Sequence, residues 1–163
     1  MKLSVEEMPI GTVALAESGG CITNLYFQRD TLPHDAERCE TELIREAFRQ
    51  LRGYLKGDLR QFTLPLAPAG TPFMLRVWRF LSDIPYGTTA SYKEVATAIG
   101  NPRAFRAVGM ANHRNPLPLF IPCHRVIGSD GSLTGYRGGV ELKKRLLERE
   151  RSLTGCGGVR YFC

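Results

Sequence analysis

The hydrophobic residues of the first 28 positions fall in three short segments with the pattern of strands. These segments, residues 3–8, 11–17 and 20–28, contain strand-compatible residues, and Gly11 and the Gly19-Gly20 pair mark the turns that lead into the second and third segments. Short apolar segments bounded by glycine turns are typical of strands that follow one another in a sheet. The sequence therefore predicts a small antiparallel sheet at the start of the chain.

Residues 36–56 have the hydrophobic period of a helix instead. Apolar side chains recur on one face, and Gly57 follows the last of them, a common way for a helix to end. The residues of this face are Leu43, Ala47, Leu51 and Leu55. Prolines and a glycine then follow between 65 and 72, which predicts a linker or domain boundary. We place an N-terminal α/β scaffold domain at 1–66 and a second domain at 67–163.

The second domain begins with helical patterns. Pro72 suits the first turn of a helix whose apolar residues are Phe73, Val77, Trp78 and Leu81. Ser91 and Glu94 have the spacing of a capping box and open a helix to about Ile99. The break at 100–102 and a further helix over 103–112 complete a helix-turn-helix pattern. The second helix of this pattern, over 103–112, carries arginines and small residues, which suits binding in a DNA groove. Small residues are also favoured where a helix packs tightly inside the protein.

The end of the chain has one more helical pattern. Asn115 and the prolines after it stop the preceding helix, and the apolar segment LFIPCHRVIG follows. Asp130-Gly131 suits a tight turn, and Gly138-Gly139 introduces a helix with Leu142, Leu146 and Arg149 on one side. The whole pattern predicts an α+β chain whose second domain is mainly helical.

Charge separates the two halves of the 163 residues. Residues 1–70 hold 8 Lys and Arg against 10 Asp and Glu, whereas residues 71–163 hold 14 against 6. A basic second half predicts a polyanionic partner, with nucleic acid as the leading candidate, although ordinary solubility charge is the alternative. The N-terminus lacks the apolar core of a secretory signal, and no stretch is long and apolar enough for a membrane span. We therefore expect a soluble cytoplasmic protein.

The five cysteines predict reduced thiols. Cys21, Cys39, Cys123, Cys156 and Cys163 are odd in number and have no CxxC spacing, which argues against a disulfide framework. Cys21, His34 and Cys39 match no common zinc module. We expect neither a metal nor another cofactor.

The segment IPCHRV places Cys123 beside His124 and Arg125. A nucleophilic thiol needs a nearby base or cation to favour its thiolate, and these neighbours supply both types. In an extended segment, successive side chains point to opposite faces, so Cys123 and His124 would not touch directly unless the backbone turns there, and a bridging water would link them. Glu141, Glu148 and Glu150 are candidates to orient the imidazole, and periodicity does not choose among them. The alternatives are a metal ligand pair or a buried, inert cysteine.

Residues 71–150 resemble a known family. The stretches TPFMLRVWRFLSDIPYGTTASYKEVA, NPRAFRAVGMAN, NPLPLFIPCHRVIG and GSLTGYRGGVELKKRLLERE are similar to the DNA-binding and catalytic domain of the O6-alkylguanine-DNA alkyltransferases, and they include that family's PCHRV signature. The first domain resembles the family's ribonuclease-H-like domain in size and in the order of strands and helix. This resemblance implies a single-turnover repair protein that takes an alkyl group from O6-alkylguanine, and possibly O4-alkylthymine, in double-stranded DNA.

The resemblance also implies roles for single residues. Cys123 would accept the alkyl group, His124 would act as its base through a water, and Glu150 would orient His124. Asn115 would tie the helix-turn-helix to the active-site segment. Contacts to DNA and to the flipped guanine would come from Tyr92, Arg106, Tyr136, Val126, Arg103 and Ser91, with Tyr92 donating a proton to the leaving guanine and Arg106 entering the base stack. We expect a monomer.

Three other functions are compatible with parts of the sequence. A lesion sensor of the alkyltransferase-like kind would bind damaged DNA without reacting, but such proteins lack the cysteine that is present here at position 123. A helix-turn-helix transcription factor would account for the basic half and leave IPCHRV without a role. A cysteine hydrolase would turn over many substrate molecules.

Overall fold

The computed structural model describes residues 1–154, and Cys156 and Cys163 lie outside them. The chain folds as two compact units, the first spanning Met1–Ala69 and the second starting at Gly70. In the described part of the chain, no helix is long and apolar enough to cross a membrane.

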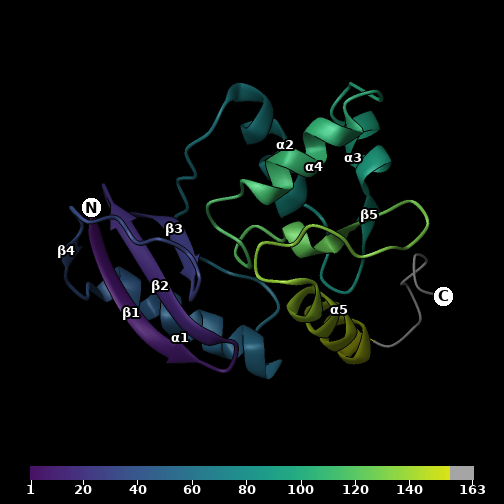
Figure 1. Cartoon of the computed structure of the whole chain (residues 1–163). Coiled ribbons are helices and arrows are strands. Elements are labelled where there is room, and N and C mark those ends of the chain that lie inside the picture. Colours follow the sequence, from purple (N-terminus) through teal and green to yellow (C-terminus); the bar gives the residue numbers. More distant parts are fainter. Residues whose placement is uncertain (155–163) are drawn as a thin grey trace. The chain divides into compact units, whose positions relative to one another are not determined.

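The first unit is built on a four-stranded sheet (Figure 1). Its strands are β1 (Lys2–Met8), β2 (Gly11–Ser18), β3 (Cys21–Phe27) and the short β4 (Glu37–Arg38), arranged in the order β3-β2-β1-β4. The first three strands are antiparallel neighbours, as the sequence predicts, and β4 runs parallel to β1. Residues 13–16 of β2 are buried on both faces of the sheet, so β2 forms the centre of this core.

Helix α1 (Glu42–Lys56) packs against this sheet (Figure 1). It ends at Gly57, which has a φ of 87°, as expected for a glycine stop. The predicted start at residue 36 is wrong, because β4 occupies part of that segment and the Thr41 side chain accepts a hydrogen bond from the Ile44 backbone N–H. The buried face also differs by one position at its start: Ile44 is buried, whereas Leu43 is partly exposed.

The second unit is mainly helical. It contains α2 (Pro72–Ser82), α3 (Tyr92–Ala98), α4 (Phe105–His113) and α5 (Val140–Thr154). Val77, Trp78 and Leu81 of α2 are buried, and the Trp78 indole N–H donates to the carbonyl of Ala111 in α4 at 2.9 Å. Phe73 is only partly buried, because it lies in the first turn of α2, close to the end of the helix.

A short parallel pairing brings distant segments of this unit together. Strand β5 (Ala90–Ser91) pairs with β6 (Val126–Ile127), so that Ala90 lies opposite Val126. Ser91 then caps α3 with the predicted capping box to Glu94. As a result, the start of the helix-turn-helix is fixed beside the residues that follow Cys123.

The buried face of α5 differs from the predicted one. Arg149 is exposed and Leu142 is partly exposed. The buried residues are Lys143, Leu146, Leu147 and Glu150, which follow the helical spacing of a single face. Two charged residues on this face mask its periodicity in the sequence.

Candidate active site

Cys123 begins a 3-10 turn that spans Cys123–Arg125. The backbone therefore turns at this point, as the sequence leaves open, and is not extended. The chain turns because the Arg125 backbone N–H donates to the carbonyl of Pro122 at 3.0 Å. A 3-10 helix has three residues per turn, so the side chains of Cys123 and His124 point in different directions but not to opposite faces. Both are buried, with exposed fractions of 3% for Cys123 and 0% for His124.

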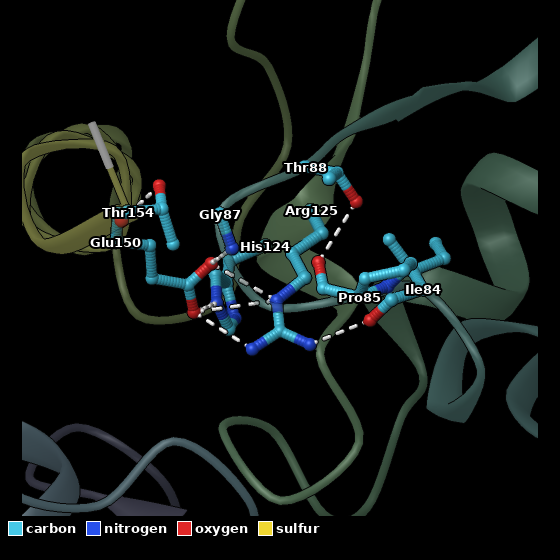
Figure 2. Close-up of polar contacts among 8 residues, drawn as sticks. All are labelled: Ile84, Pro85, Gly87, Thr88, His124, Arg125, Glu150 and Thr154. Atoms are coloured by element: carbon cyan, nitrogen blue, oxygen red, sulfur yellow. Dashed lines mark hydrogen bonds and ion pairs between the residues drawn. The ribbon is translucent and has the colours of Figure 1, made fainter. Parts of the chain in front are cut away.

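Glu150 lies directly beside His124 and Arg125 (Figure 2). The His124 Nε2 atom is 2.9 Å from Glu150 Oε1, and Arg125 reaches the same carboxylate with Nε at 3.0 Å and Nη2 at 2.9 Å. Of the three glutamates that the sequence offers on this helix, Glu141 and Glu148 are exposed. Glu150 is 1% exposed.

A loop before β5 completes the surroundings of this carboxylate (Figure 2). The Gly87 backbone N–H donates to Glu150 Oε2 at 3.3 Å, and Arg125 Nη1 donates to the carbonyl of Ile84 at 2.7 Å. Gly87 has a φ of 79°, and a Cβ atom there would lie 2.5 Å from the Thr154 hydroxyl oxygen. Glycine is therefore required for the close approach of this loop to α5.

The charges of this cluster leave His124 neutral and Glu150 ionised. Burial lowers the pKa of His124, and this effect exceeds the opposing effect of Glu150. Burial alone would raise the pKa of Glu150, but His124 and Arg125 hold it well below its usual range. An ionised carboxylate only accepts hydrogen bonds, so His124 Nε2 carries the proton of the neutral ring. The Nδ1 atom is then unprotonated and is the basic nitrogen.

The thiol of Cys123 has a different electrostatic setting. Burial raises its pKa, and a hydrogen bond from Asn115 together with the charges of Lys143 and Arg137 opposes this effect. Arg125, the cation adjacent in sequence, is instead bound to Glu150. The nearby cations that favour a thiolate therefore come from a later part of the chain than the IPCHRV segment.

Asn115 links the helix-turn-helix to this turn. Its side-chain N–H donates to the carbonyl of Ile121 at 2.9 Å, and its side-chain oxygen accepts from the Leu117 backbone N–H at 2.9 Å. The residue is 1% exposed. Because Ile121 comes two residues before Cys123, Asn115 fixes the path of the chain from α4 into the turn.

Helices α3 and α4 form the predicted helix-turn-helix, and α4 has an exposed, basic face. Val108 and Ala111 are buried beneath it, whereas Arg103 and Arg106 are exposed. The small residues of α4 predict a helix with a narrow profile, but this face also carries two large side chains, Phe105 and Met110, which are 36% and 50% exposed. The Arg106 and Lys93 cations lie 6.0 Å and 5.7 Å from the centre of the Phe105 ring.

A pocket of about 410 Å³ lies between this face and the loop before α5. Its lining residues come from α3, α4 and the loop, and include Tyr92, Phe105, Arg106, Met110, His113 and Thr134. The Tyr92 hydroxyl donates to the carbonyl of Thr134 at 3.4 Å. The thiol of Cys123 lies near enough to raise the pKa of Tyr92 and of Tyr136, although burial is the larger cause for both.

The structure therefore brings most of the sequence-predicted residues into two adjoining groups. Cys123, His124, Glu150 and Asn115 surround the turn, and Tyr92 and Arg106 line the pocket. Val126 and Tyr136 are buried, Ser91 caps α3, and Arg103 is exposed in the turn that precedes α4. In the described part of the chain, no group of three or more His, Cys, Asp or Glu side chains is placed to hold a metal ion.

Sequence reasoning missed two features of this site. The sequence predicts that the charge of Arg125 favours the thiolate of Cys123, whereas Arg125 forms an ion pair with Glu150. Sequence reasoning also overlooked Lys143, which is 1% exposed and donates to the carbonyl of Val126 at 2.6 Å. Its spacing of seven residues from Glu150 is the one available signal, because it places the two residues on the same helical face.

Each of the two units matches the model of a known protein family. Residues 1–68 match the family model of the 6-O-methylguanine DNA methyltransferase, ribonuclease-like domain. Residues 72–152 match the model of the 6-O-methylguanine DNA methyltransferase, DNA binding domain.

Individual relatives match over nearly their whole length. The methylated-DNA–protein-cysteine methyltransferase of Methanosarcina barkeri is 48% identical over 156 residues, which cover 93% of this chain and 98% of the relative. The constitutive enzyme of that name from Bacillus subtilis is 45% identical over 89% of this chain and 92% of the relative. The crystal structure of Mycobacterium tuberculosis OGT in complex with DNA superimposes with a TM-score of 0.88 and 43% identity, covering 94% of each chain.

Proposed function

Because the chain belongs to the 6-O-methylguanine DNA methyltransferase family, we propose that it repairs DNA by moving the alkyl group of O6-alkylguanine onto Cys123. The observation that carries this proposal is the buried turn in which Cys123 precedes a neutral histidine bound to an ionised glutamate. Such an arrangement supplies a nucleophile, a base and a group that orients the base.

The reaction begins with the proton of the Cys123 thiol. His124 takes it through a water at its basic Nδ1 atom, while Glu150 stabilises the resulting imidazolium. The thiolate then attacks the alkyl carbon, so that the S–C bond forms as the bond from carbon to O6 breaks. The electron pair of the broken bond stays on the guanine, which recovers a proton from Tyr92. The imidazolium of His124 then returns its proton through water to the phenolate of Tyr92, so the products are guanine, a thioether and a protein with His124 and Tyr92 in their starting protonation states.

Access to the alkyl group requires the nucleotide to leave the base stack. Flipping costs a few kcal/mol, and less for a damaged base that pairs poorly. Arg106 is exposed beside the pocket, where it can enter the vacated stack, and Arg103 and the helix start at Ser91 can meet phosphates. The carbonyl of Val126 and the ring of Tyr136 would then line the guanine site.

The thioether determines the stoichiometry. No group in the site is assigned to cleave an S–C bond, so each protein molecule reacts once. We assign this chemistry and DNA binding to the second domain, at 67–163, and a scaffold role to the first, at 1–66. The proposed protein acts as a monomer, without a cofactor, in the cytoplasm where prokaryotic DNA lies.

A direct test is the mass of the peptide that contains Cys123 after the protein is mixed with duplex DNA carrying O6-methylguanine. We expect a gain equal to one CH2 group, complete at one alkyl group per protein, and no gain in Cys123→Ser. Tight binding of the damaged duplex without any mass gain would identify a non-reacting lesion sensor instead. Repeated turnover of an ester or amide would identify a hydrolase.

A further inference from the structure

Asn112, in the last turn of α4, is a buried residue whose side-chain amide is unpaired. It is 8% exposed, and neither its side-chain oxygen nor its side-chain nitrogen has a hydrogen-bond partner among the residues that the structure describes. Burying a polar group without a partner is unfavourable, and most buried side-chain amides in proteins are paired. The unpaired amide of Asn112 therefore indicates a partner that the protein itself does not supply.

The helical positions around Asn112 direct its amide toward the pocket beside α4. Phe105, Gly109 and His113 line this pocket. Asn112 follows Phe105 by seven residues and Gly109 by three, which places it on the same side of the helix as both. A helical side chain leans toward the N-terminus of its helix, here over Gly109, which has no side chain to intervene. The amide therefore lies between the pocket and the core face that carries Val108.

The facing wall of the pocket does not occupy this amide. A Cβ atom added to Gly109 would lie 3.8 Å from the Tyr92 ring, so the ring faces α4 directly at the level of the glycine. The Tyr92 hydroxyl donates to the carbonyl of Thr134 and not to Asn112. A base that enters the pocket past Gly109 therefore comes within reach of an amide that no protein group holds.

The chemistry of an amide indicates which base it can pair with. An asparagine side chain offers a carbonyl oxygen as an acceptor and an NH2 group as a donor, side by side. O6-alkylguanine has a matching edge, because its 2-amino group donates and the ring nitrogen beside that group accepts. O4-alkylthymine has no amino group, so the oxygens and the nitrogen of its pairing edge all accept. The Asn112 oxygen would then face another acceptor.

We propose that Asn112 is a specificity-determining residue whose amide pairs with the 2-amino edge of the flipped base, and that it thereby selects O6-alkylguanine over O4-alkylthymine. A site built to hydrogen-bond its substrate rejects an analogue that leaves the buried polar groups of the site unpaired. The meaning of this selection for repair rests on the proposed alkyl transfer. Base binding itself can be measured in a protein that does not react.

The experiment measures DNA binding in Cys123→Ser, which lacks the proposed acceptor thiol. Three duplexes differ in one base: O6-methylguanine, O6-methylhypoxanthine, which lacks the 2-amino group, and O4-methylthymine. Asn112→Leu removes both polar atoms at similar size, and Asn112→Ala removes them without adding bulk. Asn101→Leu is the matched control, because it makes the same change at an exposed asparagine before α4. The ratio of two affinities is compared between variants, so the cost of flipping each base cancels.

We expect Asn112→Leu to weaken binding of the O6-methylguanine duplex about tenfold, as for a lost hydrogen bond in a buried site. Binding of the O6-methylhypoxanthine and O4-methylthymine duplexes should change by less than about twofold, because neither base offers the 2-amino donor. The preference for O6-methylguanine over both should therefore fall, whereas Asn101→Leu should keep it. A merely structural Asn112 would lower all three affinities equally.

Equal losses on the three duplexes, or an unchanged affinity for O6-methylguanine in a folded Asn112 variant, would overturn the proposal. Circular dichroism checks folding, and Asn112→Ala gives the answer if leucine does not fit the site. We expect both variants to fold, because each removes an unpaired buried amide. A protein with Cys123 intact that takes no alkyl group from O6-methylguanine would refute the proposed function instead, and the affinity ratios would still decide the role of Asn112.

Discussion

Arg125 and Glu150 form a buried ion pair in which the guanidinium group meets both oxygens of the carboxylate. The same carboxylate accepts from His124, and the same guanidinium group donates to the carbonyl of Ile84. Glu150 of α5 therefore orients the His124 imidazole, and Arg125, the next residue in the chain, neutralises the Glu150 carboxylate. The thiol turn, the loop before β5 and the last helix are held together at this pair (Figure 2).

Replacing Arg125 by methionine tests how much this pair matters for stability. Glu150 would stay buried with a neutral histidine as its partner, so we expect the free energy of unfolding to fall by about 3–5 kcal/mol. Urea unfolding at neutral pH gives the value. Arg149→Met, an exposed change on α5, should stay within about 0.5 kcal/mol of the wild type. An equal effect of the two changes would contradict the structural role of Arg125.

Glu150→Gln tests the orientation of the base. The amide keeps the shape of the side chain but removes the charge that stabilises an imidazolium, so we expect the transfer rate to fall about a hundredfold. Binding of the methylated duplex should change little. Single-turnover transfer measures the rate, and Glu148→Gln is the matched control, because Glu148 is exposed on the same helix. A wild-type rate in Glu150→Gln would remove Glu150 from the proposed mechanism.

Stability should fall in mild acid because of His124. Its pKa in the folded protein lies below the ordinary 6.5, so below that pH the unfolded chain binds a proton that the folded protein does not. Glu150 acts in the same direction at lower pH: its folded pKa lies below 4.5, so its contribution is present above 4.5 and is lost as pH falls further. Urea unfolding across this range gives the slope, and His124→Gln should flatten its upper part. A wild-type slope in His124→Gln would assign the effect to other groups.

The elements of the fold follow from local signals in the sequence to a large extent. Glycine turns separate the first three strands, Gly57 ends α1, and the capping box at Ser91 starts α3. Each signal depends on residues that are neighbours in the chain. The start of α1 was predicted too early because the continuous helical pattern outweighed Thr41, a residue whose hydroxyl can cap a helix.

The site was predictable only where family resemblance supplied long-range information. Periodicity did not separate Glu150 from Glu148, because the difference lies in contacts with a turn 25 residues away. Lys143 was missed for a related reason: a lysine in a helical pattern indicates a solvent-facing position, and its burial depends on the carbonyl of Val126. The 3-10 turn at Cys123 likewise has no periodic signal, since it is a single turn.

Arg103 and Arg106 should respond differently to replacement by alanine. We expect Arg103→Ala to weaken binding to all duplexes and to reduce the dependence of log affinity on log salt by about one, as for a lost phosphate contact. Arg106→Ala should lower transfer from duplex DNA far more than transfer from a free O6-alkylguanine base, which needs no flipping. Binding isotherms at several salt concentrations and single-turnover rates make the comparison. Equal losses on both substrates would exclude a flipping role for Arg106.

Phe105 offers a further test of how α4 meets DNA. Its ring is 36% exposed, lies beside the Arg106 cation and lines the pocket. Apolar side chains inserted between base steps help to unstack them, so we expect Phe105→Ala to weaken duplex binding about tenfold and to slow transfer from duplex DNA. The salt dependence should stay unchanged, because no charge is removed. Phe105→Leu, which keeps an apolar wedge, should recover most of the affinity. A loss of folding stability in Phe105→Ala, with unchanged DNA affinity per folded molecule, would show instead that the ring stabilises the helix.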